Sequence, residues 1–432
     1  MQKIPTLKGL VALSPIMVFL AVYLVTSIVA GDFYRVPVPV AFLISGIYAI
    51  CISHGNLMER INVFSQGAGH PNVLLMVWIF ILAGAFTGTA KDIGAIDATV
   101  GAMLRIFPSR MLYAGLFLTS CFISMAIGTS VGTIVALVPL GAGIATQAAI
   151  DPAYITAIIV GGAFFGDNLS FISDTTIAAT RYAGCKMRDK FRTNIVIIAP
   201  AVIAVTAIYL LQGQAVGAIE APQEVDVIKI LPYLLVIVMG IFAGNVTFTL
   251  LVGILVNATL GFIGGDFTWL TLLDSLGRGF ASMNDLIIVT LLAGGMLGII
   301  RKEQGLDFII QTLTAHVRGR RGAQGAIAAL VSLANICTAN NTIAIISVGD
   351  IAREISTRYG IPPRKTASLL DTFSCLIQGV LPYGAQLLMA AGMASIASTA
   401  IIPHLYYPFI MGLCAILSII FDFPRMAKTD KP

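Results

Sequence analysis

The sequence predicts an all-α polytopic membrane protein with about 10 to 13 transmembrane or re-entrant helices, some of them broken, in two repeated halves. Three observations lead to this prediction: an apolar composition, apolar runs of membrane-spanning length, and an internal repeat. Of the 432 residues, 57% are hydrophobic and 11% are charged, and the mean hydropathy is +0.92. Soluble domains carry about 25% charged residues, so we expect no sizeable soluble domain.

Apolar runs of about 20 residues, the length that crosses a bilayer, recur from one end of the chain to the other. The candidate spans are 10–30, 36–53, 72–90, 110–127, 129–149, 154–166, 192–212, 228–243, 246–264, 286–300, 322–349, 365–391 and 394–421. The first run is too long for the core of a signal peptide and lacks a clear cleavage site, so we interpret it as the first span. Gly, Pro or polar residues interrupt several runs, which predicts broken helices.

The charges between the spans predict the orientation of the chain. The stretches 181–192 and 353–365 are basic, and so is the tail after residue 424. By the positive-inside rule these segments face the cytoplasm. The segment 213–227 has three acids and no Lys or Arg, which suits the outside. We therefore expect an integral protein of a bacterial cytoplasmic (inner) membrane with a cytoplasmic C-terminus.

An internal repeat divides the chain. Leu82-Ala83-Gly84 recurs as Leu292-Ala293-Gly294, an offset of 292 − 82 = 210. The same offset brings Gly128-Thr129-Ser130 onto Thr338-Ala339-Asn340. Duplication explains one ungapped offset better than chance does, and two-fold repeats are a building plan of secondary transporters. The predicted parts are a first transmembrane half (1–212), an acidic connecting loop (213–227) and a second transmembrane half (228–432).

Four polar breaks interrupt the apolar runs, two in each half. They are 128–133, 166–176, 338–342 and 370–374, the last followed by Pro382-Tyr383-Gly384. In both halves a break rich in Thr, Ser or Asn precedes a break that carries Asp. A broken membrane helix exposes backbone groups that hold an ion or a substrate. Hard cations prefer oxygen ligands, so the breaks predict a cation site.

The candidate ion- and proton-binding residues are Asp167, Asn168, Ser170, Ser173, Asp174, Thr175, Thr176 and Asp371. The candidate substrate-lining residues are Thr129, Ser130, Thr133, Asn340, Asn341, Thr342, Thr372, Ser374 and Tyr383. Charge at membrane depth is costly and marks ion pathways, so Asp167 and Asp174 are the expected Na⁺ ligands. Two carboxylates that close cannot both ionise cheaply, so one is expected to hold a proton that Na⁺ displaces.

Structural roles are the alternative for several of these residues. Thr129, Ser173, Asp174 and Asn341 are favoured residue types for capping half-helices. Ser and Thr in membrane helices also often bond back to their own backbone. Capping and ion binding are compatible. The six cysteines form no CxxC or Cys/His spacing, so we expect neither a metal cofactor nor a disulfide framework.

Other function classes fit the sequence less well. There is no GxxxxGK[ST] motif and no soluble domain to house one, which argues against an ATP-driven pump. The net charge of +5 is spread over short loops, so we expect no nucleic-acid partner. An intramembrane aspartyl hydrolase is a weaker alternative, because the Asp-bearing segments lack a Tyr-Asp or Gly-x-Gly-Asp pair. We therefore predict a transporter and not an enzyme.

The run from Gly161 to Thr176 resembles the signature of the NhaC-type Na⁺/H⁺ antiporters in the ion transporter superfamily. The similarity extends to Gly128-Thr129-Ser130 upstream and to Asp371 and Pro382-Tyr383 downstream, and it covers nearly the whole chain. It implies inverted repeats, broken helices and Na⁺-coupled exchange. We therefore predict a secondary antiporter that exchanges Na⁺, or Li⁺, for protons.

The second half departs from the pattern of that family. Leu370 stands where better-studied members carry an acid, Tyr383 stands where they carry Trp, and an acid is absent near Asn341. Together with the amides of Gln378 and Gln386, these departures support an alternative function. In this alternative the chain is a Na⁺- or H⁺-coupled carrier of a small organic acid or amino acid. The expected partners are Na⁺, H⁺, membrane lipid and, for the alternative, an organic solute. A homodimer is left open.

Overall fold

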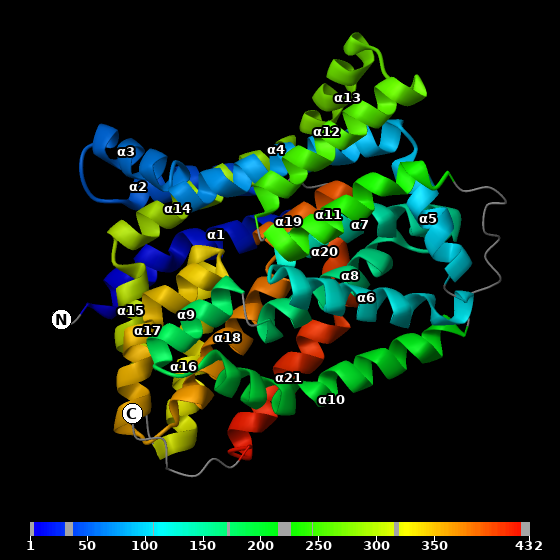
Figure 1. The fold of residues 1–432 in the computed structure, drawn as a ribbon. Helices are drawn as coiled ribbons and strands as arrows, with labels where there is room; N and C mark the ends of the chain where they lie inside the picture. Colours follow the sequence, from blue (N-terminus) through cyan, green and yellow to red (C-terminus); the bar gives the residue numbers. More distant parts are fainter. Residues whose placement is uncertain are drawn as a thin grey trace.

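The computed structural model describes residues 4–30, 38–106, 108–170, 173–214, 226–243, 245–314 and 319–424. Within these ranges every regular element is a helix: 21 α-helices and three short 3-10 helices (Figure 1). The all-α prediction is confirmed. The basic tail and most of the predicted acidic loop lie outside the described residues.

The helices follow one another in two comparable series. The first is α1 (Thr6–Ala30), α2 (Val38–Ile52), α3 (Leu57–Ala68), α4 (Pro71–Asp92), α5 (Ala95–Ile106), η1 (Ser109–Met111), α6 (Leu112–Ile127), α7 (Ser130–Gln147), α8 (Pro152–Leu169), α9 (Asp174–Ala183) and α10 (Met187–Gly213). The second is η2 (Ile228–Ile230), α11 (Leu231–Ala243), α12 (Val246–Gly264), α13 (Trp269–Ala281), α14 (Asn284–Lys302), α15 (Gly305–Thr314), α16 (Gly319–Thr338), α17 (Asn341–Arg358), α18 (Pro363–Val380), α19 (Ala385–Ala394), α20 (Ser398–Ile401), η3 (Ile402–His404) and α21 (Tyr406–Ile420).

The helix boundaries keep the offset of the sequence repeat to within one residue, so that Gly128 corresponds to Ala339 rather than to Thr338. The first residues of α7, α8 and α9 are 130, 152 and 174, and those of α17, α18 and α19 are 341, 363 and 385, which is 211 positions later in each case. α5 and α15 begin 210 positions apart, at Ala95 and Gly305. These bounds are consistent with duplication. The division at 213–227 and the inversion of the halves stay predictions.

Eight helices in the described ranges are long and apolar enough to cross a membrane, or nine if the bent pair Ser398–His404 and Tyr406–Ile420 is one span. The expected count of about 10 to 13 is larger because it includes interrupted and short runs. α2 has 15 residues and α11 has 13, which is less than the roughly 20 that a full crossing needs. The larger count, with re-entrant segments, stays a prediction.

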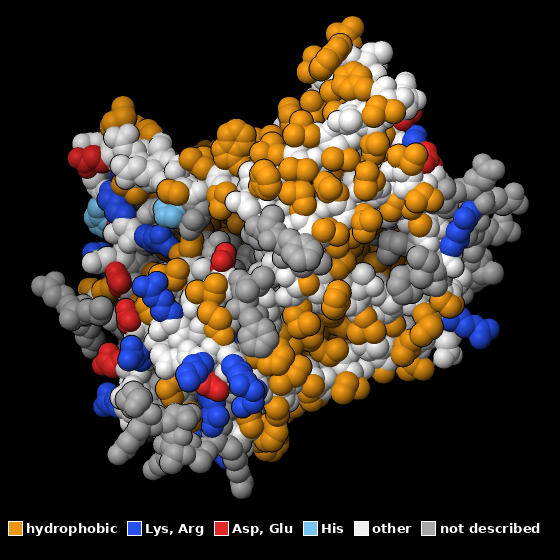
Figure 2. Space-filling model, viewed as in Figure 1, with side chains coloured by type: hydrophobic (Ala, Val, Ile, Leu, Met, Phe, Trp, Pro, Cys, Tyr) orange, Lys and Arg blue, Asp and Glu red, His pale blue; other side chains and the backbone are white. Residues whose placement is uncertain are grey.

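Large apolar side chains cover much of the outer surface. Figure 2 shows them across the face turned to the viewer, with charged side chains gathered at its lower left. Leu7, Ile263 and Leu270 are each more than three-quarters exposed. Soluble monomers rarely expose a continuous apolar surface of this extent. The surface therefore fits contact with lipid.

The helices pack in two groups, and each group takes helices from both halves of the chain. In the upper part of Figure 1, α2, α3 and α4 pack with α12, α13 and α14. Below them, α6 to α10 pack with α16 to α19 and α21. We call these the upper and lower groups. All the candidate site residues described by the structure lie in the lower group or in the breaks between its helices.

α8 is almost wholly buried, and small residues let α6 approach it closely. A Cβ atom added at Gly166 would lie 2.3 Å from Ser124 Cβ and 2.4 Å from the backbone nitrogen of Met125. Only glycine permits this approach, as is common where membrane helices pack tightly. The close contact fixes the last turn of α8, from which Asp167 projects.

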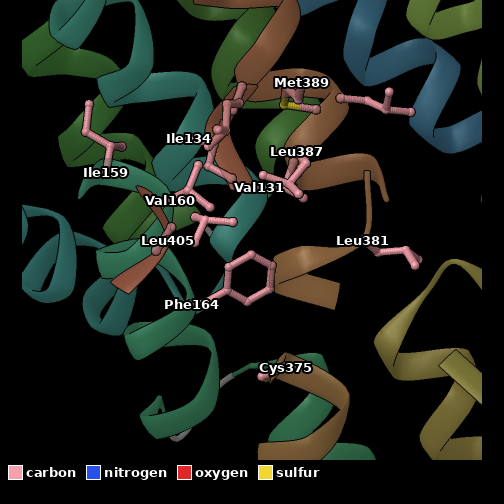
Figure 3. Packing of buried hydrophobic residues seen from close by; sticks show 14 of the residues in the cluster. Val131, Ile134, Ile159, Val160, Phe164, Cys375, Leu381, Leu387, Met389 and Leu405 are labelled. Atoms are coloured by element: carbon pink, nitrogen blue, oxygen red, sulfur yellow. The ribbon is translucent and has the colours of Figure 1, made fainter. Parts of the chain in front are cut away.

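Apolar side chains fill the space next to that turn. In Figure 3, Val131 of α7, Val160 and Phe164 of α8, and Leu387 of α19 lie around one interior region. Val160, Phe164 and Leu387 are fully buried. Phe164 lies one helical turn before Asp167, so this packing keeps a low-dielectric environment beside the carboxylate.

The first break of each half has the same backbone conformation. α6 ends at Gly128 with φ of 79°, and the extended residue Thr129 (φ −149°) precedes α7. In the second half Ala339 has φ of 49°, and the extended Asn340 (φ −150°) precedes α17. A left-handed residue followed by an extended one therefore interrupts the helix in both halves, as the polar sequences predicted.

The second break of each half lies between α8 and α9 and between α18 and α19. The prediction of a break at 370–374 is wrong, because these residues lie inside α18 and the interruption comes at 381–384. The hydroxyl of Ser374 bonds back to the carbonyl of Asp371 at 3.0 Å, so a polar residue here leaves the helix intact. Likewise, 166–169 belong to α8.

Candidate functional site

Two carboxylates lie in the interior of the lower group. Asp167, in the last turn of α8, is 5% exposed, and Asp371, in the middle of α18, is 0% exposed. Buried charges require hydrogen bonds or a counter-ion. The two carboxylates meet this requirement differently, Asp167 with neutral donors and Asp371 with a cation.

Asp167 accepts hydrogen bonds from three helix breaks. Ser173, between α8 and α9, donates to Oδ1 at 2.8 Å. Ser130, the first residue of α7, donates to Oδ2 at 3.0 Å. Asn341, the first residue of α17, donates to the same oxygen at 3.1 Å. The breaks of both halves therefore converge on one carboxylate and surround it with hydroxyl and amide groups.

A chain of amides extends this cluster to the fourth break. Gln386, at the start of α19, donates to the hydroxyl of Ser130 at 3.1 Å. Gln378, near the end of α18, donates to Gln386 Oε1 at 2.8 Å and to the carbonyl of Ala339 at 3.1 Å. These bonds tie the α18–α19 break to the α16–α17 break and to Ser130. The start of α19 is therefore linked by a hydrogen bond to Ser130, a direct partner of Asp167.

Asp371 is held by an ion pair. Lys190 Nζ lies 2.6 Å from its Oδ2, and the two side chains are 1% and 0% exposed. Asn168 and Asn194 also donate to Oδ2, at 2.9 and 3.4 Å. Asp371 Oδ1 has no hydrogen-bond partner in the described part of the chain. One oxygen of Asp371 thus accepts from several donors, while the other is buried without a donor in the described part of the chain.

Lys190 was missed by the sequence interpretation, which placed 181–192 in a basic cytoplasmic loop. That prediction is wrong for Lys190, because α10 already begins at Met187 and turns this side chain inward. Its ammonium bonds to the carbonyl of Asn168 and, at 2.7 Å, to the hydroxyl of Thr176. The available signal was the spacing of Lys190 and Asn194, one helical turn apart at the start of an apolar run.

Asp174 is not brought into this cluster. It is the first residue of α9 and is exposed. Among the described contacts it makes none with Asp167, and its neighbour Ser173 turns inward instead. The acid linked to Asp167 through its adjacent residue, Asn168, is Asp371. A role for Asp174 in ion exchange stays a prediction.

Several other predicted residues join the cluster. Thr175 lies 2.7 Å from the hydroxyl of Ser173 and donates to the carbonyl of Asp167 at 3.3 Å. Thr372 accepts from Asn168 at 3.2 Å. Thr175 and Thr372, like Thr176, are buried. The α8–α9 break therefore supplies hydroxyls to both carboxylates or to their partners.

Backbone roles account for others. Asn340 caps α17 by accepting from the backbone of Ile343 at 2.9 Å. Thr133 bonds back to the carbonyl of Thr129 at 3.1 Å, and Tyr383 donates to the carbonyl of Ile336 at 2.8 Å. Ser170 donates to the carbonyl of Met125 at 3.0 Å, and Thr342 donates its backbone N–H to the side chain of Asn341 at 3.1 Å. Thr129 and Ser173 occupy N-cap positions without a side-chain capping bond.

A cavity of about 100 Å³ adjoins the α16–α17 break, between the two groups of helices. Its polar lining residues are His70, Thr290, Arg301, Thr338, Asn340 and Tyr383. Within the described ranges, the guanidinium of Arg301 makes neither a hydrogen bond nor an ion pair. An unpaired guanidinium beside a cavity can bind a carboxylate.

The donor set suits a monovalent hard cation better than a transition metal. The described residues hold no group of three His, Cys, Asp or Glu that could bind a metal ion. The site instead offers carboxylate, hydroxyl and amide oxygens, which are hard ligands. Asp371 Oδ1 and Gln378 Oε1 are buried acceptors without a partner in the described part.

Comparison with known proteins identifies the family. A model of the Na⁺/H⁺ antiporter family matches residues 5–213 and 221–423. The Na⁺/H⁺ antiporter NhaC of Alkalihalophilus pseudofirmus is 22% identical over 438 residues, covering 94% of this chain and 93% of that protein. The malate-2H⁺/Na⁺-lactate antiporter of Bacillus subtilis is 23% identical over 446 residues, covering 93% of each.

Another transporter and a solved structure are also similar to this chain. The arginine/ornithine antiporter ArcD of Halobacterium salinarum is 23% identical over 411 residues, covering 84% of this chain and 80% of that protein. The solved structure of the Alcanivorax borkumensis YdaH transporter is 15% identical, with a TM-score of 0.40, and covers 84% of this chain and 88% of that one. The family match spans nearly the whole chain, as the resemblance to NhaC-type members predicted. The chain belongs to the Na⁺/H⁺ antiporter family, in the NhaC group of secondary membrane transporters.

Proposed function

We propose that the chain is a Na⁺/H⁺ antiporter in which Asp167 exchanges Na⁺, or Li⁺, for a proton. The observation that carries the proposal is the set of three donors on this buried carboxylate, Ser130, Ser173 and Asn341, each from a different helix break. Broken helices that meet at an acid are the usual construction of an ion site in secondary transporters. Membership of the family supports the same reaction.

The exchange follows from competition for Asp167. Its ionised carboxylate binds Na⁺, and the hydroxyls of Ser130 and Ser173 turn their oxygens from donation to ligation, since a hydroxyl both donates and accepts. Protonation of Asp167 removes the charge that holds the ion. The bound ion and the bound proton therefore exclude each other, and either loaded form has a less charged interior than the empty one.

The test is proton movement in inverted vesicles from cells that express the chain, with respiration acidifying the interior. Addition of Na⁺ or Li⁺ is expected to alkalinise the interior rapidly. Asp167→Asn is nearly isosteric but cannot ionise, so the response should be lost. The matched control is Asp151→Asn at the other end of α8, where the side chain caps the helix and Asn caps equally well. A full response in Asp167→Asn contradicts the proposal.

Asp174 enters the proposal as an acid on the approach to Asp167, because it is exposed at the first turn of α9. Asp174→Asn is then expected to raise the Na⁺ concentration for half-maximal exchange and to leave the maximal rate intact. A Na⁺ titration in the same vesicles measures both quantities. Complete loss of exchange at saturating Na⁺ would instead assign Asp174 to the exchange step itself.

A second candidate function is a Na⁺- or H⁺-coupled carrier of a small organic acid or amino acid. The unpaired Arg301 beside the cavity at Asn340 and Tyr383 favours it, as do relatives named for organic-acid and amino-acid exchange. Thermal unfolding with a panel of carboxylic and amino acids tests it. Stabilisation by one solute that is lost in Arg301→Gln but kept in Lys302→Gln supports the carrier, and stabilisation by Na⁺ alone argues against it.

A further inference from the structure

The ion pair of Lys190 and Asp371 uses every donor of the lysine. Its ammonium contacts Asp371 Oδ2 at 2.6 Å, Thr176 Oγ1 at 2.7 Å and the carbonyl of Asn168. A lysine ammonium has three N–H donors, so each has its own acceptor. Both side chains of the pair are essentially inaccessible, at 1% and 0% exposed.

The three acceptors around Lys190 match a charged ammonium better than a neutral amine. A neutral amine would leave the charge of Asp371 buried without a counter-ion, and the loss of one partner of a buried pair is strongly destabilising. It would also give up one of the three donors that link α10 to the α8–α9 break and to α18. These contacts are the ones that a charged Lys190 beside an ionised Asp371 needs.

The pair sets the charge of the whole cluster. Among the described residues, the charged side chains of the hydrogen-bonded cluster are Asp167, Asp371 and Lys190. Two negative charges and one positive charge leave a formal charge of −1. A single Na⁺ or a single proton brings that charge to zero, which is the cheapest state inside a membrane protein.

We propose that Lys190 is the permanent counter-ion of Asp371, which leaves Asp167 as the one exchangeable carboxylate, so that the chain trades one Na⁺ for one proton. The inference rests on the proposed antiport. Lys190 is a positioning residue, because it acts through Asp371 and does not touch the exchanged ion. Its consequence is a fixed stoichiometry, and one-for-one exchange moves no net charge across the membrane.

The first measurement is the voltage dependence of exchange. Purified protein in liposomes is given opposing gradients of radioactive Na⁺ and pH, and a K⁺ gradient with valinomycin sets the membrane potential. One-for-one exchange gives the same final Na⁺ ratio with and without the potential. If two protons moved per Na⁺, the final ratio would change by roughly 50-fold per 100 mV. A shift of that size overturns the inference while leaving Na⁺/H⁺ antiport in place.

The second measurement removes the charges of the pair singly and together. Lys190→Met makes the cluster −2, so the unpaired Asp371 captures a proton or cation of its own, and exchange should fall by about tenfold or more. Lys190→Met with Asp371→Asn restores −1 and should recover exchange to within about threefold of the wild-type rate, because an uncharged pair no longer needs a counter-ion. A double variant no more active than the single variant overturns the inference.

A matched control separates this effect from the loss of any buried lysine. Lys365 of α18 is 2% exposed, and its ammonium bonds to the hydroxyl of Ser418 and to the carbonyl of Phe423. Lys365→Met is expected to keep voltage-independent exchange. Rate loss in this control equal to that in Lys190→Met would mean that the loss reports packing, and it would overturn the assignment.

Thermal unfolding tests the pair without reference to transport. Lys190→Met and Asp371→Asn are each expected to lower Tm, and the double variant is expected to lower it by less than the two changes added together, because each single change strands its partner. Strictly additive changes overturn the counter-ion role. Absence of Na⁺/H⁺ exchange in the wild type would contradict only the proposed function. The Tm values of the single and double variants would still test whether Lys190 is the counter-ion of Asp371.

Discussion

At the scale of single residues, the partners of Asp167 matter more than its burial. Asp371 is more deeply buried, yet a lysine neutralises it. Within the described residues, the side chain of Asp167 has only hydroxyl and amide partners, from Ser130, Ser173 and Asn341. Neutral partners stabilise the carboxylate without cancelling its charge, so an incoming cation still gains from binding there.

Ser130→Ala is expected to weaken Na⁺ binding and to leave the exchange reaction possible. The change removes one oxygen from the shell of Asp167 and also the acceptor of Gln386. A hydrogen bond to a charged group contributes about 1.5–3 kcal/mol, so the Na⁺ concentration for half-maximal exchange should rise about tenfold or more. A Na⁺ titration of vesicle exchange measures this rise.

The control for Ser130→Ala is Thr146→Val in the same helix, where the hydroxyl bonds back to the carbonyl of Ala142. It should keep the wild-type Na⁺ dependence. An unchanged half-maximal concentration in Ser130→Ala would remove this hydroxyl from the proposed ion shell.

Glu303 should make the stability of the protein sensitive to acid. It lies just beyond α14 and accepts from Ser53 at 2.7 Å and from the backbone of His54 at 2.9 Å, and the ring of His54 lies 2.7 Å away. Burial raises the pKa of Glu303, but the hydrogen bonds from Ser53 and His54 outweigh it and hold the pKa below its usual range.

The sign of this effect follows from linkage. A carboxylate whose pKa is lowered by folding stabilises the fold above its unfolded pKa of about 4.3 and loses that contribution as the pH falls through the folded pKa. Thermal unfolding of detergent-solubilised protein should therefore give a Tm that falls more steeply below about pH 5 in the wild type than in Glu303→Gln. Parallel curves would show that Glu303 contributes nothing to acid sensitivity.

The residue types of the site were predictable, but their partners were not. Asp167, Ser130, Ser173 and Asn341 stand out because polar residues are rare in apolar runs. Lys190 did not, because its charge looks like that of the neighbouring basic residues until α10 turns it toward Asp371. That contact joins positions far apart in the sequence, and no local pattern encodes it.

At the scale of elements, the two halves interrupt their helices in the same way with different residues. Gly128 has φ of 79°, and Ala339 occupies the matching place with φ of 49°. Glycine adopts this conformation freely, whereas alanine pays a steric cost there. The same left-handed conformation is therefore unstrained at Gly128 in the first half and strained at Ala339 in the second.

Exchanging these two residue types should have opposite effects on stability. Gly128→Ala is expected to lower the free energy of unfolding by about 1 kcal/mol, and Ala339→Gly to raise it by about 0.5–1 kcal/mol. Chemical or thermal unfolding of each single variant measures its change in the free energy of unfolding. Changes of the same sign would contradict the matched conformations.

Breaks were predictable where the backbone needs a special residue or an extended cap, as at Gly128-Thr129 and Ala339-Asn340. The expected break at 370–374 failed for a physical reason. Polar side chains inside a helix can bond to the backbone or to one another, as Ser374 does with the carbonyl of Asp371. Polarity alone therefore does not distinguish a break from an intact helix with a buried polar face.

At the scale of the whole molecule, two cavities lie between the upper and lower groups. The cavity of about 100 Å³ borders the starts of α17 and α19. A second, of about 600 Å³, borders α4, α5 and α13 and reaches 139–147 of α7 and 392–395 at the end of α19. Ser130 and Gln386 lie at the starts of α7 and α19, and the larger cavity borders the other ends of these two helices. The two cavities therefore border opposite ends of α19.

The all-α membrane architecture and the family followed from composition and from the 161–176 motif. The number of spans did not, because short helices such as α2 and α11 are as apolar as full spans. Length, tilt and re-entry are set by packing between helices rather than by hydropathy. The arrangement of two mixed groups likewise depends on contacts between the halves.

Proton release when Na⁺ binds to purified protein is the most direct test of exchange at Asp167. The protein is held in detergent in weakly buffered solution, Na⁺ is added at a series of pH values, and a pH indicator records the protons released per Na⁺ bound. The account predicts one proton per Na⁺ for the wild type where Asp167 is protonated, and none for folded Asp167→Asn. Undiminished release from Asp167→Asn, or Na⁺ binding to the wild type without release at any pH, would contradict it.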